Sequence, residues 1–345
     1  MTLSWRNRDP QYRPYFHLPR TAQPASWSLP ALCAAYDLPR GLTGGGNHIG
    51  IVELGGTYSP SDMLAFCHAV GMPMPDVNNI GSLFPSDPNG ADIEVALDMQ
   101  VAAFVNWWCT GQRPTLEMIW DQTGNIYPGI ATAAAAGCDT CSISWGAPEN
   151  EWALSDALAL DAAGWAAGAS GMAVCAASGD NDYGDGESGV HVDLPAAAPS
   201  IIGCSGTTKT ATTEVCWNNG SAEGTGGGFS TIWKRPKWLT GTPHLGPANW
   251  GRPVGDVSAN ADPETGYEIY CGGQGIIVGG TSAVAPFWTG LLSAITAQPG
   301  FCTWKLYAER WSAFHPITEG NNGKWPASIC CGLGVPSATI AMHLK

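Results

Sequence analysis

Apolar runs alternate with helix-forming stretches along the first half of the chain. Strands are predicted in short runs rich in Ile, Val, Leu and Ala, at residues 47–54, 116–120, 140–145 and 172–177. Helices are predicted in the stretches between them, at residues 60–70, 92–105, 130–136 and 151–169. Because such alternation is typical of βαβ units, we expect an α/β fold with a parallel sheet covered by helices on both faces.

The two ends of the chain have a different pattern. The first 47 residues predict an extended entry, with residues 1–26 as an extended N-terminal segment and one short helix near residues 29–36. After residue 201 the chain is richer in glycine and turns. Two hairpin-like pieces and a last helix are predicted there, at residues 213–217, 267–278 and 283–294. No linker or repeat interrupts the sequence, so we expect residues 1–345 to form a single domain.

The start of the chain is polar, aromatic and interrupted by proline. It lacks the apolar stretch of a secretory signal, so we expect no signal peptide in this chain, and the compartment stays open. No window approaches roughly 18 uninterrupted apolar residues, which predicts no membrane span.

Charge narrows the choice of partners. The chain has 15 basic and 29 acidic residues, a formal net charge of −14. Phosphate binding needs clustered Lys and Arg, and none are clustered, so nucleic acid is not an expected partner. A protein surface with few Lys and Arg residues suits acidic surroundings, because protonation of its carboxylates there limits the repulsion between them. An ordinary acidic protein has the same composition.

The 12 cysteines do not have the spacing of a disulfide framework. Cys141, Cys175 and Cys204 lie in apolar runs, where a thiol behaves as a small hydrophobic group. Cys141 also completes a CxxC motif that has no second pair, and Cys330 and Cys331 are adjacent. We therefore expect no structural metal on cysteine.

Residues 279–286, with the sequence GGTSAVAP, hold the first candidate for catalysis. Ser282 falls at the expected start of a helix, where free N–H groups favour negative charge. A G-T-S-x-x-x-P string is similar to the nucleophile region of subtilisin-like serine peptidases, although a serine that caps an ordinary helix also fits. None of the seven histidines has the neighbouring Gly-Thr of a subtilisin base. Either the site is inactive or another group takes the serine proton.

Glu94 and Asp98 are candidates for that group. They lie four residues apart in a predicted helix, so they share one face at about 5–6 Å between Cβ atoms. Crowding of two carboxylates among apolar residues raises one pKa and lets the pair share a proton. Such a pair can accept a serine proton in acid, where imidazole is already charged. A solvent-facing helix edge is the alternative interpretation.

Asp180 follows the apolar strand predicted at residues 172–177. The carboxyl ends of parallel strands are where α/β folds place their sites. A protonated aspartic acid there can donate a hydrogen bond to the oxyanion of a tetrahedral intermediate. A turn aspartate before Asn181 and Asp182 is the simpler alternative.

Together these residues resemble the sedolisin family, the serine-carboxyl peptidases. The resemblance covers the chain from about residue 27 and rests on an ordered series of motifs. In order these are Glu94-x-x-x-Asp98, SISWG at 142–146, SGD at 178–180, TGGG at 225–228, DVSANADP at 256–263 and GTS at 280–282.

The resemblance implies a subtilisin-like fold around a mainly parallel, seven-stranded sheet, and endopeptidase activity in acid on polypeptide substrates. By position, Glu94 is implied as general base, Asp98 as its partner, Ser282 as nucleophile and Asp180 as the oxyanion residue. Other residues are implied to support the base (Glu53, Trp145) or to hold the substrate backbone (Ser144, Gly146, Gly226, Gly227, Gly228).

Two features depart from the family pattern. Members bind calcium near the C-terminus through an aspartate before Ile-Thr and a later Gly-x-Gly-x-Asp. This chain has Pro316 at the first position, and residues 325–334 lack the later ligands, so we expect no calcium and no other cofactor. Relatives also carry a long N-terminal prodomain, which we do not expect within this chain. A chain that folds without a prodomain also fits the role of a component of a larger assembly.

An acid-acting endopeptidase is therefore the leading hypothesis, because all four implied catalytic positions carry the required residue types. The alternative is a structural or binding protein on the peptidase fold with vestigial catalysis. A histidine-dependent subtilase is disfavoured by the missing histidine motif. The resemblance implies an extracellular setting, and the missing apolar window predicts no membrane partner.

Overall fold

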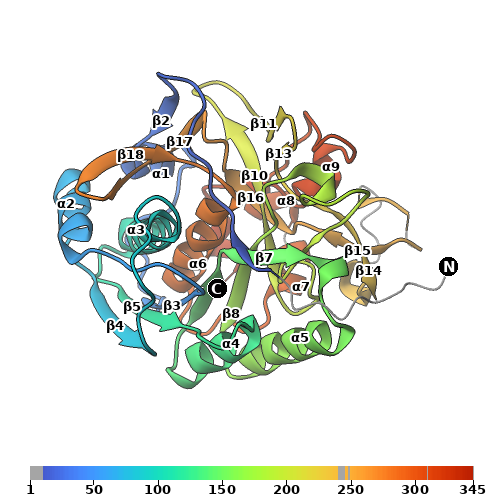
Figure 1. Ribbon diagram of the computed structural model, residues 1–345, viewed down its shortest axis with the longest axis horizontal. Coiled ribbons are helices and arrows are strands. Elements are labelled where there is room, and N and C mark those ends of the chain that lie inside the picture. The colour runs from blue at the N-terminus through green and yellow to red at the C-terminus, as the bar shows by residue number, and fades with distance from the viewer. Residues whose placement is uncertain (1–10, 240–244, 248, 309, 345) are drawn as a thin grey trace.

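A parallel sheet forms the centre of the molecule (Figure 1). The computed structural model describes residues 11–239, 245–247, 249–308 and 310–344. The sheet has eight strands, of which all but β11 run parallel. Beginning at one edge, they are β4 (Asp76–Ile80), β5 (Thr115–Trp120), β3 (His48–Glu53), β6 (Thr140–Ile143), β8 (Ala173–Ala177) and β10 (Ile202–Lys209), with both β16 (Val257–Asn260) and β11 (Glu214–Cys216) paired to β10.

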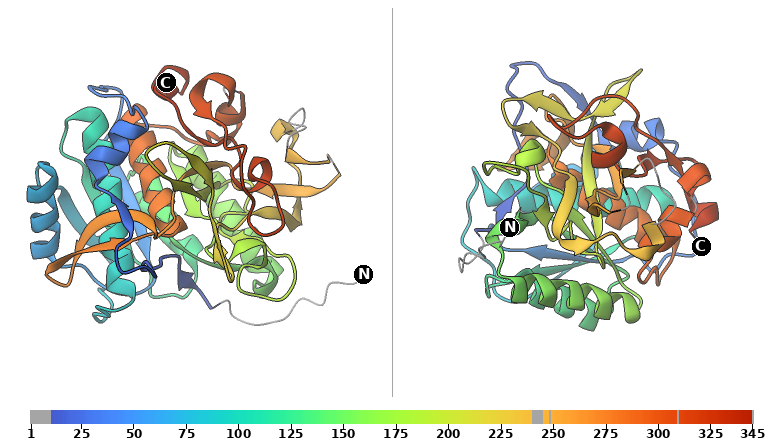
Figure 2. Two further views of the ribbon diagram at one scale, coloured as in Figure 1. Left: turned by 90° about the horizontal axis from the view of Figure 1, so that it is seen from above. Right: turned by 90° about the vertical axis from the view of Figure 1, so that its right-hand side faces the viewer.

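Helices cover both faces of this sheet, as the alternating pattern predicts (Figures 1 and 2). Side chains alternate along each strand, so Cys175 and Ala177 of β8 pack in one core while Val174 and Ala176 pack in the other. The first core holds α1 (Leu29–Ala35), α2 (Pro60–Val70), α3 (Ala91–Thr110) and α6 (Val284–Ile295), and the second holds α4 (Ile126–Ala135) and α5 (Leu154–Ala169).

Two central helices approach each other closely enough to require a glycine. A Cβ atom on Gly290 of α6 would lie 2.5 Å from the carbonyl oxygen of Ala102 on α3. This contact brings the N-terminal end of α6 beside α3, and the candidate site lies where these two helices meet the sheet.

Smaller strand pairs surround the sheet. The predicted hairpin at 267–278 is confirmed as β17 and β18, joined by two glycines with φ of 64° and 78°. In one three-stranded sheet, β7 (Trp145–Pro148) pairs with β1 (Arg13–Pro14) and with β9 (Asp193–Leu194). In another, β17 (Thr265–Cys271) pairs with β2 (Ala25–Trp27) and with β18 (Gln274–Val278). The two-stranded sheets are β12 (Asn218–Gly220) with β13 (Glu223–Gly224), β14 (Gly228–Lys234) with β15 (Gly251–Val254), and β19 (Phe314–His315) with β20 (Val335–Pro336). Short helices α7 (Thr303–Ala308), α8 (Arg310–Ala313), α9 (Ala327–Cys330) and α10 (Ile340–His343) follow α6.

Some boundaries differ from the predictions. The run at 140–145 is two strands, β6 and β7, separated at Ser144, whose carbonyl oxygen and hydroxyl both turn toward the candidate site. Helix α3 continues to Thr110, where Gly111 ends it at φ 69°. The sheet has eight strands instead of seven because β11 folds back onto the end of β10. The subtilisin-like, mainly parallel α/β class is confirmed. No helix in the described part of the chain is long and apolar enough to cross a membrane.

Candidate active site

Four predicted residues come together around the N-terminal end of α6. Glu94 and Asp98 lie one turn apart on α3, Ser282 lies in a 3₁₀ turn (Thr281–Ala283) directly before α6, and Asp180 follows β8. All four are 0–1% exposed. The structure therefore confirms two predicted positions: Ser282 lies where a helix begins, and Asp180 follows the end of a strand.

The Ser282 hydroxyl lies between backbone groups of two other segments. Its Oγ atom accepts a hydrogen bond from the Tyr15 N–H at 3.0 Å and donates to the Ser144 carbonyl oxygen at 3.3 Å. The preceding Gly280 has φ of 128°, a conformation that side-chain-bearing residues rarely adopt. This glycine lets the chain turn sharply into the helix.

Three carboxyl groups form a buried network beside the serine. Ser144 Oγ donates to Asp98 Oδ1 at 2.8 Å, and Trp145 Nε1 donates to Glu53 Oε2 at 2.9 Å. Apart from the nearby Ser282 hydroxyl, the carboxyl oxygens of Glu94 have no hydrogen-bond partner among the described residues. Glu94 is thus the member of the network that is free to take a proton from a hydroxyl.

Burial controls the protonation of these groups. Burial first, and then the charge of Asp98, raise the pKa of Glu94 well above its usual value, although the nearby Ser282 hydroxyl lowers it. Burial and Asp98 likewise raise the pKa of Glu53. The pKa of Asp98 is also raised by burial, and the hydrogen bond from Ser144 opposes this. The three groups therefore titrate together and share protons in acid.

Asp180 lies on the other side of the serine. Its Oδ1 atom accepts from the Thr281 N–H at 2.8 Å and from Thr281 Oγ1 at 2.7 Å, and His17 Nε2 lies 3.5 Å from Oδ2. Burial raises the pKa of Asp180 to about 6, with His17 and Thr281 acting in the opposite direction. The carboxyl is therefore protonated below about pH 6, as an oxyanion donor requires.

A segment from the beginning of the chain lies across this site. We call residues 13–17 the entry strand; Figure 1 shows it in dark blue beside β7. Arg13 pairs with Gly146, and the N–H and C=O of His17 both bond to Gly279, at 2.8 and 2.9 Å. Between these anchors, the Tyr15 N–H bonds the Ser144 carbonyl at 3.2 Å, and the Ser282 N–H donates to the Tyr15 carbonyl oxygen at 3.0 Å. The segment lies on the serine as an extended peptide would.

The Tyr15 side chain fills a pocket lined by charged residues and is only 1% exposed. Its hydroxyl donates to Asp193 Oδ2, and Arg13 Nη2 lies 3.3 Å from Asp185 Oδ1. Burial raises the pKa of Asp185 to about 7, while Arg13 lowers it. Burial and then Asp185 raise the pKa of Asp193 well above its usual value. The pocket thus offers a carboxyl group at its end to a long polar side chain.

The predicted backbone-binding residues divide into two sets. Ser144 and Gly146 contact the entry strand, as described above. Among the described residues, glycines 226–228 form no hydrogen bond with the entry strand. They pack on protein backbone or side chains instead: a Cβ on Gly226 would lie 1.8 Å from the Ser178 carbonyl oxygen, and one on Gly228 would lie 2.6 Å from Trp325 Nε1.

Sequence reasoning missed three residues of the site: Tyr15, His17 and Asp193. The first two belong to a segment predicted only as extended, and Asp193 lies in a stretch without periodicity. The available signal was the sequence RPYFH at 13–17, which predicts an extended peptide but not its position.

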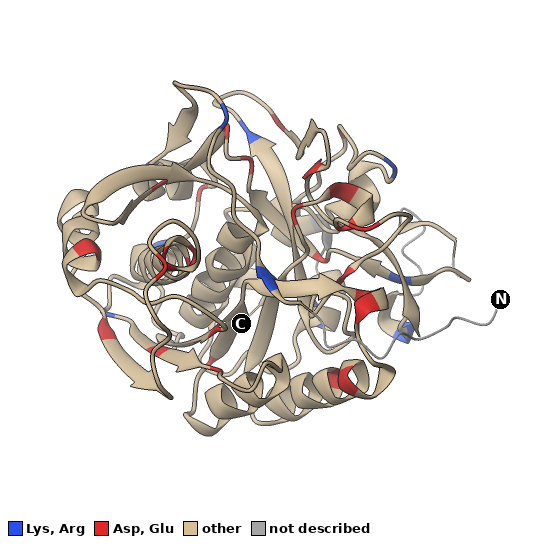
Figure 3. Ribbon diagram, in the orientation of Figure 1, with Lys and Arg blue, Asp and Glu red and all other residues tan. Residues whose placement is uncertain are grey.

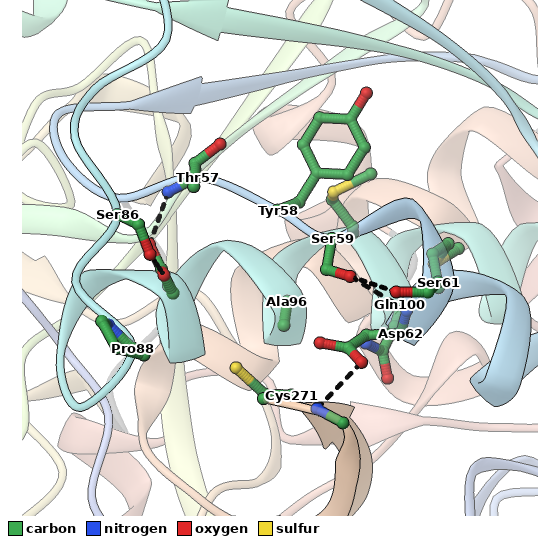
Figure 4. Close-up of a pocket in the computed structure, with 15 residues that line it drawn as sticks. Thr57, Tyr58, Ser59, Ser61, Asp62, Ser86, Pro88, Ala96, Gln100 and Cys271 are labelled. Atoms are coloured by element: carbon green, nitrogen blue, oxygen red, sulfur yellow. Dashed lines mark hydrogen bonds between the residues drawn. The ribbon is translucent and has the colours of Figure 1, made fainter.

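A separate pocket of about 290 Å³ opens between α2, α3 and the β17–β18 turn (Figure 4). It contacts Asp92 and Ala96, on the opposite face of α3 from Glu94. Its carboxylates already have partners: Asp92 accepts from the Thr57 N–H and Ser86, and Asp62 accepts from the Gly273 N–H. The pocket lies outside the arrangement around Ser282.

Lys and Arg are scattered over the described ribbon (Figure 3).

The C-terminal position implied for calcium has a different donor set. Strands β19 and β20 pair, and a Cβ on Gly334 would lie 2.1 Å from the His315 carbonyl oxygen and 2.8 Å from Pro316 Cα. The two facing segments, 314–317 and 332–336, contain no Asp or Glu. Calcium affinity depends largely on carboxylate oxygens, so these residues do not fit the ion.

We predict that millimolar calcium leaves the melting temperature unchanged to within about 1 °C, because a ligand stabilises a fold only by binding it. Scanning calorimetry with calcium, with magnesium as the control cation, measures this. A rise of several degrees that is specific to calcium would show that other ligands hold the ion.

Comparisons with known proteins agree with this geometry. No family model matches the chain. Pseudomonas sedolisin, a serine-carboxyl proteinase solved with pseudo-iodotyrostatin, has a TM-score of 0.76 at 24% identity, over 94% of this chain and 99% of that chain. Sphericase has a TM-score of 0.52 at 17% identity, over 92% of this chain and 99% of that chain. The fold is therefore that of the subtilisin-like peptidases.

Sequence identity narrows this class to one family. Kumamolisin from Bacillus sp. (strain MN-32) is 36% identical over 348 residues, 91% of this chain and 62% of kumamolisin. Sedolisin from Pseudomonas sp. (strain 101) is 33% identical over 186 residues, 46% of this chain and 30% of sedolisin. These identities support the sedolisin family for this chain, which spans less than two thirds of the length of these curated relatives.

Proposed function

We propose that this chain is a serine-carboxyl endopeptidase that cleaves polypeptides in acid through an acyl-enzyme on Ser282. The observation that carries the proposal is the extended Tyr15 peptide on the site, with its carbonyl oxygen 3.0 Å from the Ser282 N–H. The buried Glu94 and Asp98 flank the same serine. The relatives of this chain by sequence include proteins named kumamolisin and sedolisin.

Proton transfer begins the reaction. The three crowded carboxyls Glu53, Glu94 and Asp98 cannot all be ionised, so they share protons. Glu94 accepts the Ser282 proton because its oxygens have no other partner in the described chain, and Asp98 takes up the change in charge. Trp145 and Ser144 hold Glu53 and Asp98 in place through their hydrogen bonds.

The Ser282 oxygen then attacks the carbonyl carbon of the bound peptide. The oxyanion that forms is stabilised by the Ser282 N–H and by the protonated Asp180 carboxyl. A Cβ on Gly280 would lie 2.1 Å from the Tyr15 carbonyl oxygen and 2.6 Å from Asp180 Oδ2, which places these two oxygens beside the same glycine. Glu94 passes its proton to the leaving amine, and water releases the acyl group by the reverse steps.

The substrate we propose is an extended peptide that adds a strand beside β7. Backbone hydrogen bonds at Ser144, Gly146 and Gly279 supply affinity without regard to side chains. Selection acts at the pocket that Tyr15 fills, where the Asp193 carboxyl accepts from the tyrosine hydroxyl. We expect tyrosine to be preferred over phenylalanine there, because phenylalanine lacks the hydroxyl from which this buried carboxyl accepts a hydrogen bond.

The proposal is tested by the hydrolysis of an unfolded protein between pH 2 and 8. We expect activity in acid that falls as pH rises through about 6, because Asp180 loses its proton there. Asparagine in place of Asp180 keeps an N–H donor but cannot ionise, so it should move this falling limb. An active-site serine reagent should label Ser282 over the same pH range. A folded chain with no hydrolysis and no labelling at any pH would favour the binding-protein alternative.

A further inference from the structure

Three cysteines from distant parts of the chain meet at one place in the protein interior. Cys216 ends β11, Cys330 ends α9 and Cys331 follows it. Their Sγ atoms all lie within 4.8 Å of one another, and all three residues are buried. We call this group the three-cysteine cluster. The proposed peptidase mechanism does not use it.

The closest pair of sulfur atoms is nearer to bonding distance than ordinary packing allows. Cys216 Sγ lies 3.1 Å from Cys330 Sγ. Non-bonded carbon atoms rest about 3.5–4.0 Å apart, and sulfur is larger than carbon. A disulfide bond is about 2.05 Å long, so a movement of about 1 Å joins the two atoms.

A metal ion fits the same three residues less well. Tetrahedral zinc with Zn–S bonds of about 2.3 Å places its sulfur ligands about 3.8 Å apart, well above the distance of the Cys216–Cys330 pair. No fourth His, Cys, Asp or Glu joins the cluster among the described residues. The neighbouring groups are carbonyl oxygens: those of Trp325 and Pro326 lie 3.5 and 3.4 Å from Cys330 Sγ. Partial negative charge there disfavours three thiolates but not a neutral disulfide.

The cluster also has one thiol that is readily deprotonated. Burial raises the pKa of Cys330, but hydrogen bonds from the Cys216 and Cys331 thiols more than offset this, so the pKa lies well below its usual value. The pKa values of Cys216 and Cys331 are raised. A thiolate is the nucleophile in thiol–disulfide exchange, and this lowered pKa belongs to the packed cluster, so it favours exchange at Cys330 only once the three cysteines have met.

We propose that Cys216 and Cys330 form a disulfide that joins the end of β11 to the C-terminal segment, leaving Cys331 reduced. The oxidant is a low-molecular-weight disulfide that meets the chain during folding, before the cluster is buried. The thiolate of one of the two cysteines attacks one sulfur of the oxidant, forming a mixed disulfide and releasing one small thiolate. The other cysteine then loses its proton and attacks the protein sulfur of the mixed disulfide, releasing the second small thiolate. The two cysteines lose two electrons and two protons, which convert the oxidant into two thiols.

The disulfide holds a backbone position next to the candidate active site. A Cβ on Gly227 would lie 2.9 Å from Cys330 Cβ, and Asn322 Nδ2 donates to the Gly227 carbonyl oxygen at 3.1 Å. The two cysteines are 114 positions apart, so the bond closes a long loop and removes much freedom from the unfolded chain. Its loss is expected to lower the melting temperature by roughly 5–10 °C.

The experiment needs no variant. The full chain is refolded with oxidised glutathione, alkylated in denaturant without reductant, digested and analysed by mass spectrometry. We expect one cross-linked peptide joining Cys216 to Cys330, absent after reduction, and an alkylated Cys331. Recovery of both Cys216 and Cys330 in alkylated form would overturn the proposal. So would release of about one zinc ion per chain from the untreated protein.

Three serine variants provide a second, independent readout. Cys331→Ser is the matched control: it should keep the cross-link and the dependence of the melting temperature on reductant. Cys216→Ser and Cys330→Ser should lose the cross-link, and reductant should no longer lower their melting temperature. A cross-link that persists in Cys216→Ser, or equal loss in all three variants, would contradict the pairing.

Discussion

Glutamine in place of Glu94 is expected to lower kcat for a peptide substrate at its acid optimum by about 10²–10⁴-fold. The amide has nearly the same size but cannot accept the Ser282 proton. Because the Glu94 oxygens have no hydrogen-bond partner in the described chain apart from the Ser282 hydroxyl, the substitution breaks no other structural bond there. KM should change little, since substrate binding uses backbone groups of β7 and Gly279. Steady-state kinetics at several pH values measure the effect.

A matched control separates catalysis from packing. Asp62 is a buried carboxyl on α2 that bonds the Gly273 N–H, outside the serine site. Asp62→Asn should keep kcat within about threefold of the parent chain while removing a buried carboxylate. If Glu94→Gln retains kcat within tenfold, another group removes the serine proton and the mechanism proposed here is wrong.

The second large effect concerns the entry strand. We expect the chain to cut itself between Tyr15 and Phe16 when it is brought to about pH 4, because the Tyr15 carbonyl already bonds the Ser282 N–H. The tethered peptide has an effective concentration in the millimolar range, so this reaction should precede cleavage of added substrates. Intact mass and N-terminal sequencing measure it: the product begins at Phe16.

Two comparisons make this result decisive. Ser282→Ala should stay intact under the same conditions, and the rate for the parent chain should not change on tenfold dilution, because the strand and the serine belong to one molecule. A parent chain that stays intact while it digests added protein would show that the entry strand is bound but not cleaved. A rate proportional to concentration would instead indicate cleavage between molecules.

The local parts of the site are the parts that sequence predicts. The spacing of Glu94 and Asp98 predicts a shared helix face whatever surrounds the helix. Asp180 follows from the rule that sites lie at the carboxyl ends of parallel strands, and Ser282 from the pattern that begins α6. Each interpretation needs only a few neighbouring residues, and the structure brings all four together. Their chemical roles stay predictions.

The parts that sequence does not predict depend on distant contacts. Tyr15 and Ser282 are 267 positions apart, and no local pattern joins them. No strand was predicted at β10, although Cys204 lies in an apolar run, because the chain after residue 201 is richer in glycine and turns. The small residues are instead what a doubly buried strand requires here: a Cβ on Gly206 would lie 2.6 Å from Ala261 Cβ, and Ser205 Oγ bonds Ser178 Oγ at 3.0 Å. Tertiary packing overrides propensity in such a strand.

The buried carboxyls around the site make folding a proton-uptake reaction. In the unfolded chain they titrate at their usual values, but in the folded protein the pKa of Asp180 is about 6 and that of Asp185 about 7. The stability they contribute is complete below the unfolded values and is lost as pH rises through the folded ones; for Asp180 alone this amounts to about 3 kcal/mol. Hydrogen ion thus acts as a ligand of the native state, and neutral surroundings withdraw both the proton on Asp180 and part of the energy that holds the fold.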